Sequence, residues 1–294
     1  MRLGGWAVAL ATLLLSACAS RPDFVPHYDA PTNEGTEVLI PMEPGISSSA
    51  QLVGRVCRPD IAGRSPVVVI NHGSPSRPDL RGLMQPTGCG TEAAQWFTDR
   101  GFVVVFALRR GFGRSTGPAV EDNGICRSPN YFRSGLLGAQ DIDAILRYAT
   151  SLPYVEPDAA VVIGQSTGGW ATIAYNSVPY PLARAFISFA GGRGAHAFPE
   201  PDANCRPDLL IAAAKRYGET SEAPMLWIYA ENDSSFPPAL ANEMHTAYSR
   251  AGGLAQLVFT PPYGDEGHSL FYGPGGSRVW GPLVQSYLSQ ALRP

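Results

Sequence analysis

Short runs rich in β-branched residues recur along this chain, and segments of helical length separate most of them after the second run. The spacing of apolar residues and the residue composition predict strands for the short runs and helices for the longer amphipathic segments. The expected strands are 36–41, 50–56, 66–71, 102–108, 159–165, 184–190, 224–230 and 254–260, and the expected helices are 92–100, 136–150, 168–177, 209–217, 238–251 and 279–291. This order predicts one α/β domain, residues 36–294, with a mostly parallel sheet, helices on both faces and antiparallel pairing at its start.

The first residues have the pattern of an export signal. "MRLGGWAVALATLLLSACAS" combines one early arginine, an apolar run too short to span a bilayer, and small residues around Cys18. "LSAC" resembles the lipobox of bacterial lipoproteins, which implies a signal peptide over 1–17, lipidation of Cys18 and a Pro-rich tether over 18–35. With Ala19 next, that pattern implies an outer-membrane protein facing the periplasm. The alternative is ordinary cleavage at Ala17-Cys18-Ala19, which releases a soluble periplasmic or secreted protein.

Charge and cysteine usage exclude some partners. A net charge of −3 and a pI near 6.0 argue against nucleic acid binding. Neither the histidines nor the cysteines have metal-ligand spacing, so we expect no metal and no cofactor. An exported protein can keep disulfides, and four cysteines allow three complete pairings, among which spacing does not choose: Cys57, Cys89, Cys126 and Cys205.

A serine flanked by glycines stands between a predicted strand and a predicted helix. "GQSTG" places Gly164 and Gly168 two positions on either side of Ser166, which is the G-x-S-x-G pattern of a nucleophile elbow. Such a turn strains the backbone of its central residue and lifts the hydroxyl clear of the sheet. It also aims a helix N-terminus, with its free N–H groups, at the reaction site. Ser166 is therefore the predicted nucleophile.

A serine nucleophile needs a base, and the base needs an orienting carboxylate. On this architecture the expected chain order is Ser, acid, His. Asp233 follows the seventh predicted strand and is the preferred acid. Glu231 and Asp265 are competitors, but Asp265 lies only three residues from the preferred histidine, where a contact would be merely local.

The preferred base is His268, which follows the last predicted strand. His196 and His245 precede that strand, and His245 falls inside a predicted helix, which suits a surface residue better than a base.

An acyl-transfer site also needs donors for the oxyanion, usually two backbone N–H groups. Thr167 follows the nucleophile directly and supplies one donor, and Ser74 after the third strand is the expected second donor. Gly73 would let that loop approach a substrate, whereas His72 is expected to brace the loop rather than to act as acid or base. "GCGTEA", residues 88–93, lacks a strand–turn–helix setting and is expected to be a helix entry.

The segments "NHGSP", "LRRGFGRSTG", "GQSTGGW", "YAENDSSFPP" and "GDEGHSLF" together resemble the α/β-hydrolase superfamily, closest to its dienelactone-hydrolase-like and prolyl-oligopeptidase-like branches. The resemblance implies an eight-stranded sheet whose second strand is antiparallel, with a triad of Ser166, His268 and Asp233. Dienelactone hydrolase itself uses a cysteine nucleophile, so its substrate is not carried over. The resemblance also puts the loops after the third and fourth strands side by side, which implies a bridge between Cys89 and Cys126.

Two insertions, 114–134 and 191–207, follow strands at the predicted catalytic edge and are expected to cover the pocket. Four aromatic residues either line the pocket or pack among surface loops: Tyr131, Phe132, Phe198 and Phe236. The sequence thus predicts an exported serine hydrolase that cleaves small-molecule carboxylic esters through an acyl-enzyme. The alternatives are a peptidase of the prolyl-oligopeptidase type and a non-catalytic lipoprotein with the same fold.

Overall fold

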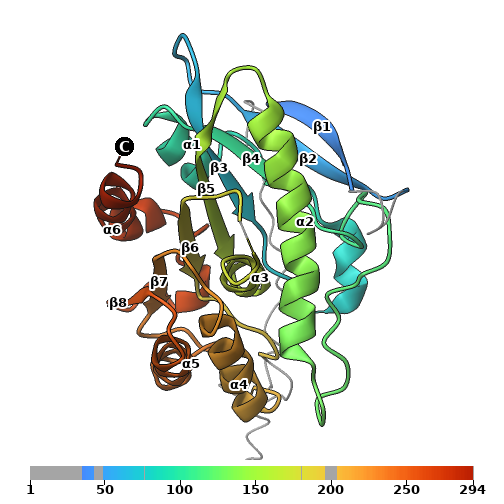
Figure 1. Cartoon of the computed structure of the whole chain (residues 1–294), viewed down its shortest axis with the longest axis vertical. Coiled ribbons are helices and arrows are strands. Elements are labelled where there is room, and N and C mark those ends of the chain that lie inside the picture. The colour runs from blue at the N-terminus through green and yellow to red at the C-terminus, as the bar shows by residue number, and fades with distance from the viewer. Residues whose placement is uncertain (1–34, 43–48, 76, 180, 196–203, 294) are drawn as a thin grey trace, which may run out of the picture.

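The computed structural model describes residues 35–42, 49–75, 77–179, 181–195 and 204–293. Their strands form one eight-stranded sheet in the order β1-β2-β4-β3-β5-β6-β7-β8 (Figure 1). The strands are β1 (Thr36–Pro41), β2 (Gln51–Cys57), β3 (Ser65–Asn71), β4 (Val103–Ala107), β5 (Val155–Gln165), β6 (Ala185–Phe189), β7 (Met225–Ala230) and β8 (Ala255–Thr260).

Strand direction follows the predicted pattern. β2 pairs antiparallel with both β1 and β4, and every other pair in the sheet is parallel. All residues of β4, β6 and β7 are buried, because helices cover both faces of a parallel sheet and the strands need apolar side chains on both sides. The expected mostly parallel eight-stranded sheet is confirmed.

The helices are α1 (Glu92–Thr98), α2 (Tyr131–Ser151), α3 (Thr167–Tyr175), α4 (Pro207–Gly218), α5 (Pro238–Arg250) and α6 (Gly276–Ala291), with short 3₁₀ turns η1 (Pro78–Leu83) and η2 (Gly267–Ser269). Helices α1 and α6 share one apolar core with one face of the sheet, and α2 to α5 share a second core with the other face (Figure 1). The expected covering of both faces is therefore confirmed.

Helix α2 begins well before the position that the sequence predicted. α2 begins at Tyr131 rather than at residue 136, because Asn130 Oδ1 accepts a hydrogen bond from Arg133 N at 3.0 Å and caps the helix there. The end of the 114–134 insertion is thus helical. The expected helix entry at 88–93 is confirmed, since Thr91 caps α1 and accepts a hydrogen bond from Ala94 N.

The predicted bridge between Cys89 and Cys126 is wrong. The disulfides are Cys57–Cys89 and Cys126–Cys205, with Cα separations of 5.5 and 5.1 Å. Cys57 and Cys89 both belong to the core under α1 and α6, whereas Cys205 belongs to the core on the opposite face and Cys126 packs against that core. The sheet therefore lies between the two pairs, and adjacency of loops along the sheet edge did not reveal on which face each cysteine lies.

The proposed signal peptide, Cys18 and the tether lie outside the described residues, apart from Gly35. Within the described ranges, none of the helices combines the length and the apolar character that a membrane crossing needs.

Candidate active site

Ser166 stands at the junction of β5 and α3 with a backbone φ of 56° and ψ of −122°. A positive φ is costly for a residue with a side chain, and such strain is typical of a nucleophile elbow. The flanking glycines make the turn possible. A Cβ on Gly164 would lie 2.1 Å from Gly168 O, and a Cβ on Gly168 would lie 2.4 Å from Asn71 O.

Neighbouring strand ends hold this turn in place. Ser166 N donates to Phe189 O at 2.9 Å, and Gly192 N donates to Ser166 O at 3.2 Å, so the end of β6 and the loop after it grip the serine backbone. The serine is only 8% exposed. It directly follows the carboxyl end of β5, at the edge of the sheet where parallel sheets carry their ligands.

The structure brings Asp233 and His268 together. Nδ1 of His268 lies 3.2 Å from both Asp233 Oδ1 and Asp233 Oδ2. The carboxylate is buried, and its Oδ1 also accepts hydrogen bonds from Ser235 N at 2.8 Å and Phe236 N at 2.9 Å. These donors fix the carboxylate, so the acid can hold one tautomer and one orientation of the imidazole.

Electrostatics at His268 favour the protonated ring. Burial by itself disfavours the imidazolium, but the Asp233 carboxylate, with a smaller contribution from Glu266, outweighs it and raises the pKa of His268 above its usual value. An imidazole that gains a proton readily is suited to act as a general base.

The described residues show no hydrogen bond between Ser166 Oγ and His268 Nε2. The two loops are nevertheless joined, because Gln165 Nε2 donates to His268 O at 3.0 Å. The residue before the serine thus anchors the turn that carries the histidine. Hydrogen bonds of this kind are often long in the free enzyme and tighten once substrate is bound.

The competing acids and bases lie elsewhere. Glu231 and Asp265 are exposed. His245 lies on α5, where its Nε2 is 2.8 Å from Ala255 O and its ring contacts Trp227, so it is partly buried rather than on the surface. His196 lies outside the described residues.

Sequence reasoning missed Glu266. Its Oε1 accepts hydrogen bonds from Ser234 N at 3.1 Å and His268 N at 3.0 Å, and its Oε2 accepts one from the Ser234 hydroxyl. Burial alone would raise the pKa of Glu266, but these donors lower it, so the carboxylate is ionised at neutral pH. Glu266 therefore clamps the loop of Asp233 to the turn of His268. The signal was its place at the N-cap of η2, two residues before the histidine.

The loop after β3 lies against the elbow. A Cβ on Gly73 would lie 3.0 Å from Ser166 Cβ, and Ser74 Oγ lies 3.0 Å from Thr167 Oγ1. The residues of the two predicted oxyanion donors, Ser74 and Thr167, are thus neighbours. The loop after β3 and the start of α3, which are distant in sequence, thus meet beside Ser166.

His72 behaves as a structural residue, as expected. Its Nδ1 donates to Gly73 O at 2.7 Å, and its Nε2 accepts from Arg109 N at 3.0 Å, so both ring nitrogens are engaged by backbone groups. Burial, together with the positive charge of Arg109, lowers the pKa of His72 to about 3. The ring is therefore neutral at physiological pH and braces the loop.

Two of the predicted pocket aromatics pack into the fold. The Tyr131 hydroxyl is buried and donates to Cys205 O, and Phe132 stacks on Tyr217 beneath Arg216. Phe236 is also buried, with its ring centroid 5.6 Å from that of His268, so it packs beside the candidate base. Phe198 lies outside the described residues.

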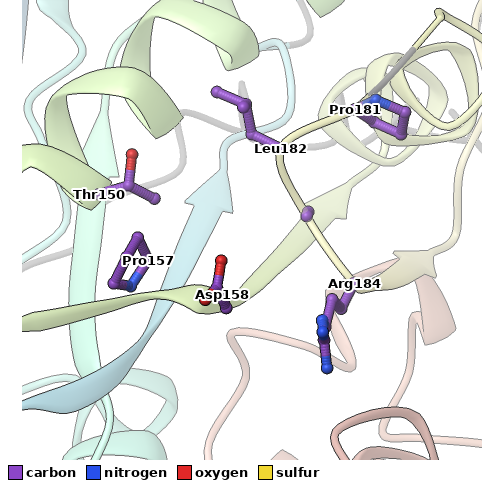
Figure 2. A pocket seen from close by; sticks show the side chains of 7 residues that line it. Thr150, Pro157, Asp158, Pro181, Leu182 and Arg184 are labelled. Atoms are coloured by element: carbon purple, nitrogen blue, oxygen red, sulfur yellow. The ribbon is translucent and has the colours of Figure 1, made fainter.

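A separate hollow of about 320 Å³ lies away from these residues (Figure 2). Pro157 and Asp158 line it from the start of β5, and Arg184 lines it from just before β6. It therefore opens at the amino ends of the strands, whereas ligands of parallel sheets bind at the carboxyl ends.

The sheet order, the strained serine between β5 and α3, and the histidine–carboxylate contact after β8 and β7 define an α/β-hydrolase. The family model for the dienelactone hydrolase family matches residues 52–276. The chain belongs to the dienelactone hydrolase family and is a hydrolase. No curated protein sequence matches it.

Solved structures share the fold. An acylaminoacyl peptidase from Pyrococcus horikoshii aligns with a TM-score of 0.64 at 19% identity, over 88% of this chain and 42% of the peptidase. A putative dienelactone hydrolase from Klebsiella pneumoniae aligns at 0.54 and 15% identity, over 87% and 98% of the two chains. Est1E from Butyrivibrio proteoclasticus, solved with ferulic acid bound, aligns at 0.58 and 15% identity, over 87% and 100%. The chain spans 35% to 42% of the length of the first peptidases it matches.

Proposed function

We propose that this chain is an exported, lipid-anchored carboxylesterase that works through an acyl-enzyme on Ser166. His268 acts as the general base and acid, Asp233 orients it, and the backbone N–H groups of Thr167 and Ser74 bind the oxyanion. The proposal rests above all on the contact of His268 Nδ1 with the buried Asp233 carboxylate, beside a strained serine turn.

The reaction has two halves. Ser166 Oγ attacks the ester carbonyl carbon while its proton passes to His268 Nε2, and the negative charge moves to the carbonyl oxygen. When this intermediate collapses, the bond to the alcohol breaks, and the alcohol leaves with the proton from His268. Water then attacks the acyl-enzyme with the same base, which releases the carboxylic acid and restores the serine.

Substrates of small or moderate size fit this chain better than lipid chains buried under a lid. The insertions 114–134 and 191–207 are short, and the described parts contain no helical lid beyond the start of α2. Est1E, one of its structural neighbours, was solved with ferulic acid bound. The alternative is a peptidase, since the acylaminoacyl peptidase shares the fold. Amide cleavage requires protonation of a poorer leaving group by the same imidazole.

A panel of chromogenic substrates distinguishes an esterase from a peptidase. We expect turnover of p-nitrophenyl esters of short and medium acids, and no turnover of aminoacyl p-nitroanilides. Hydrolysis confined to the anilides would reject the esterase in favour of the peptidase.

Covalent labelling tests whether the site is catalytic at all. A fluorophosphonate probe should label the wild type and should fail to label Ser166→Ala. The matched control is Ser151→Ala, which removes an exposed serine of α2 and should label normally. A folded wild type that resists the probe would favour a non-catalytic lipoprotein.

Export rests on the lipobox-like "LSAC" sequence. Several acyl chains on Cys18 would hold the domain at a membrane, where one chain would be marginal. Metabolic labelling with an alkyne fatty acid should mark the wild type and not Cys18→Ala. An unmarked wild type in the soluble periplasmic fraction would favour the ordinary signal peptide.

A further inference from the structure

Three charged side chains meet inside the protein behind the candidate site. Arg109, Glu121 and Arg193 are 0%, 3% and 4% exposed. Arg109 binds the Glu121 carboxylate through Nε and Nη2, and Arg193 binds it through Nη2. Arg193 Nη1 also donates to Glu121 O at 2.9 Å. Arg109 follows β4, Glu121 belongs to the 114–134 insertion, and Arg193 follows β6, so the cluster joins three loops.

The cluster carries an excess positive charge. Burial alone would raise the pKa of Glu121, but the two guanidinium groups lower it to about 2, so its carboxylate is ionised. The neighbouring His72 is neutral. Two cations thus share one anion. An unbalanced buried charge is costly, and one Arg–Glu pair would suffice to tie two loops together, so the second arginine calls for an explanation.

Arg109 contacts both segments that carry the predicted oxyanion donors. Its Nη1 donates to His72 O at 2.9 Å, and its backbone N donates to His72 Nε2 at 3.0 Å. Its Nη2 lies 3.4 Å from Thr167 Oγ1, which in turn lies 3.0 Å from Ser74 Oγ. One rigid planar side chain therefore spans the loop after β3 and the first residue of α3.

Arg193 differs in this respect. The side-chain hydrogen bonds described for Arg193 go to Glu121 alone. The two arginines have the same charge, the same anionic partner and nearly the same burial, but only Arg109 reaches the residues beside Ser166.

We propose that Arg109 is the positioning residue of the oxyanion hole, holding the His72–Ser74 loop and Thr167 at the separation that a tetrahedral intermediate requires. Donors fixed before the reaction stabilise developing charge without a cost of reorganisation. This inference rests on the proposed function of Ser166, and it adds a role that the triad does not include.

The matched variants are Arg109→Met and Arg193→Met. Each removes one positive charge and leaves one intact Arg–Glu pair, so neither strands a buried ion. For a p-nitrophenyl ester, Arg109→Met should lower kcat by about 10- to 100-fold, with little change in KM. This loss of kcat is no larger than the loss expected when a hydrogen-bond donor of the oxyanion hole is itself removed. Arg193→Met should change kcat by less than about threefold.

A trifluoromethyl ketone provides a second readout. Ser166 Oγ adds to its carbonyl carbon, the serine proton passes to His268, and the oxyanion forms on the ketone oxygen. Because this adduct resembles the transition state, its inhibition constant in Arg109→Met should rise by the same factor by which kcat/KM falls. A role confined to fold stability would not produce that proportionality.

Three results would overturn the proposal: an unchanged kcat in folded Arg109→Met, equal losses in both variants, or a lower kcat with no change in ketone affinity. If Arg109→Met does not fold in a thermal melt, Arg109→Lys decides, because it keeps the charge but lacks the planar fork. A lower kcat and weaker ketone binding in that variant support the role, and unchanged values reject it. Turnover lost in Ser166→Ala establishes the proposed function independently, whereas a wild type without Ser166-dependent turnover rejects both.

Discussion

Nδ1 of His268 lies 3.2 Å from each carboxylate oxygen of Asp233, although 35 positions separate the two residues in the chain. The parallel pairing of β7 with β8 makes this possible, because it brings the loops at the carboxyl ends of both strands to one place. Two backbone N–H groups, those of Ser235 and Phe236, also donate to Oδ1 of this carboxylate. The contact is therefore a fixed feature of the fold, and its removal gives the first prediction.

Asp233→Asn should lower kcat by about 10⁴-fold without unfolding the protein. The new amide can offer a donor to His268 Nδ1, which would place the ring proton on Nε2, where the base must be free. Ester hydrolysis and circular dichroism measure the two quantities. Asp265→Asn is the control, since Asp265 is exposed three residues before the histidine. A retained kcat in Asp233→Asn would exclude Asp233 as the orienting acid.

Glu266→Gln should shift the acid limb of the kcat/KM profile to lower pH. Asp233 and Glu266 both raise the pKa of His268, and the neutral imidazole is the active base, so removing one negative charge lets the ring lose its proton at a lower pH. The value of kcat/KM on the plateau above this limb should also fall by about tenfold, because a neutral amide accepts the hydrogen bonds from Ser234 N and His268 N more weakly than the carboxylate does.

The control for the clamp is again Asp265→Asn, which removes a neighbouring negative charge without touching Ser234. Its profile should match that of the wild type. Equal shifts in both variants would attribute the effect to general surface charge instead of the clamp.

His72 should make the protein sensitive to acid. The pKa of His72 is about 3 in the folded chain and near 6.5 in the unfolded chain. As the pH falls below 6.5, His72 therefore becomes protonated in the unfolded chain but stays neutral in the folded chain. This contribution to stability is complete above pH 6.5 and is lost as the pH falls toward 3. Between pH 6.5 and 5, the wild type should lose about 2 kcal/mol of unfolding free energy relative to His72→Gln.

The comparison with His72→Gln matters because Asp141 acts in the opposite sense. Burial, only partly offset by Arg110, raises its pKa to about 6, so it favours the folded state as the pH falls through that value. Urea titrations of both proteins at several pH values isolate the His72 contribution. Parallel curves for wild type and variant would show that His72 titrates normally in the folded protein.

Replacing Cys126 and Cys205 with serine should lower the unfolding free energy by about 2–5 kcal/mol. The bridge closes a segment with a sequence separation of 79, and it joins the two insertions near the candidate site. Guanidinium denaturation of the oxidised wild type and the double variant measures the difference. An unchanged denaturation midpoint would mean that the bridge contributes nothing to stability.

Local patterns were enough for much of the fold. Continuous apolar runs such as "VVVIN" identified buried strands, and "GQSTG" after such a run located the elbow, because each depends on residues adjacent in the chain. The start of α2 was missed, since "YFRSG" contains a glycine and has no helical periodicity. Asn130 as a cap, and the burial of Tyr131 against Cys205, decided it.

The sequence by itself predicted the strands and helices in their order along the chain, the turn that carries the serine, and the later acid and histidine, because short-range periodicity and chain order encode them. Only the tertiary structure decided which cysteines pair, because the sequence does not show on which face of the sheet a cysteine in a loop packs. Only the tertiary structure likewise revealed the hydrogen bond between Glu266 and Ser234. It also revealed the ion pairs that join Glu121 to Arg109 and Arg193. Ion pairs and hydrogen bonds between loops act over a few ångströms, and only the packing of parallel strands brings those loops within that range.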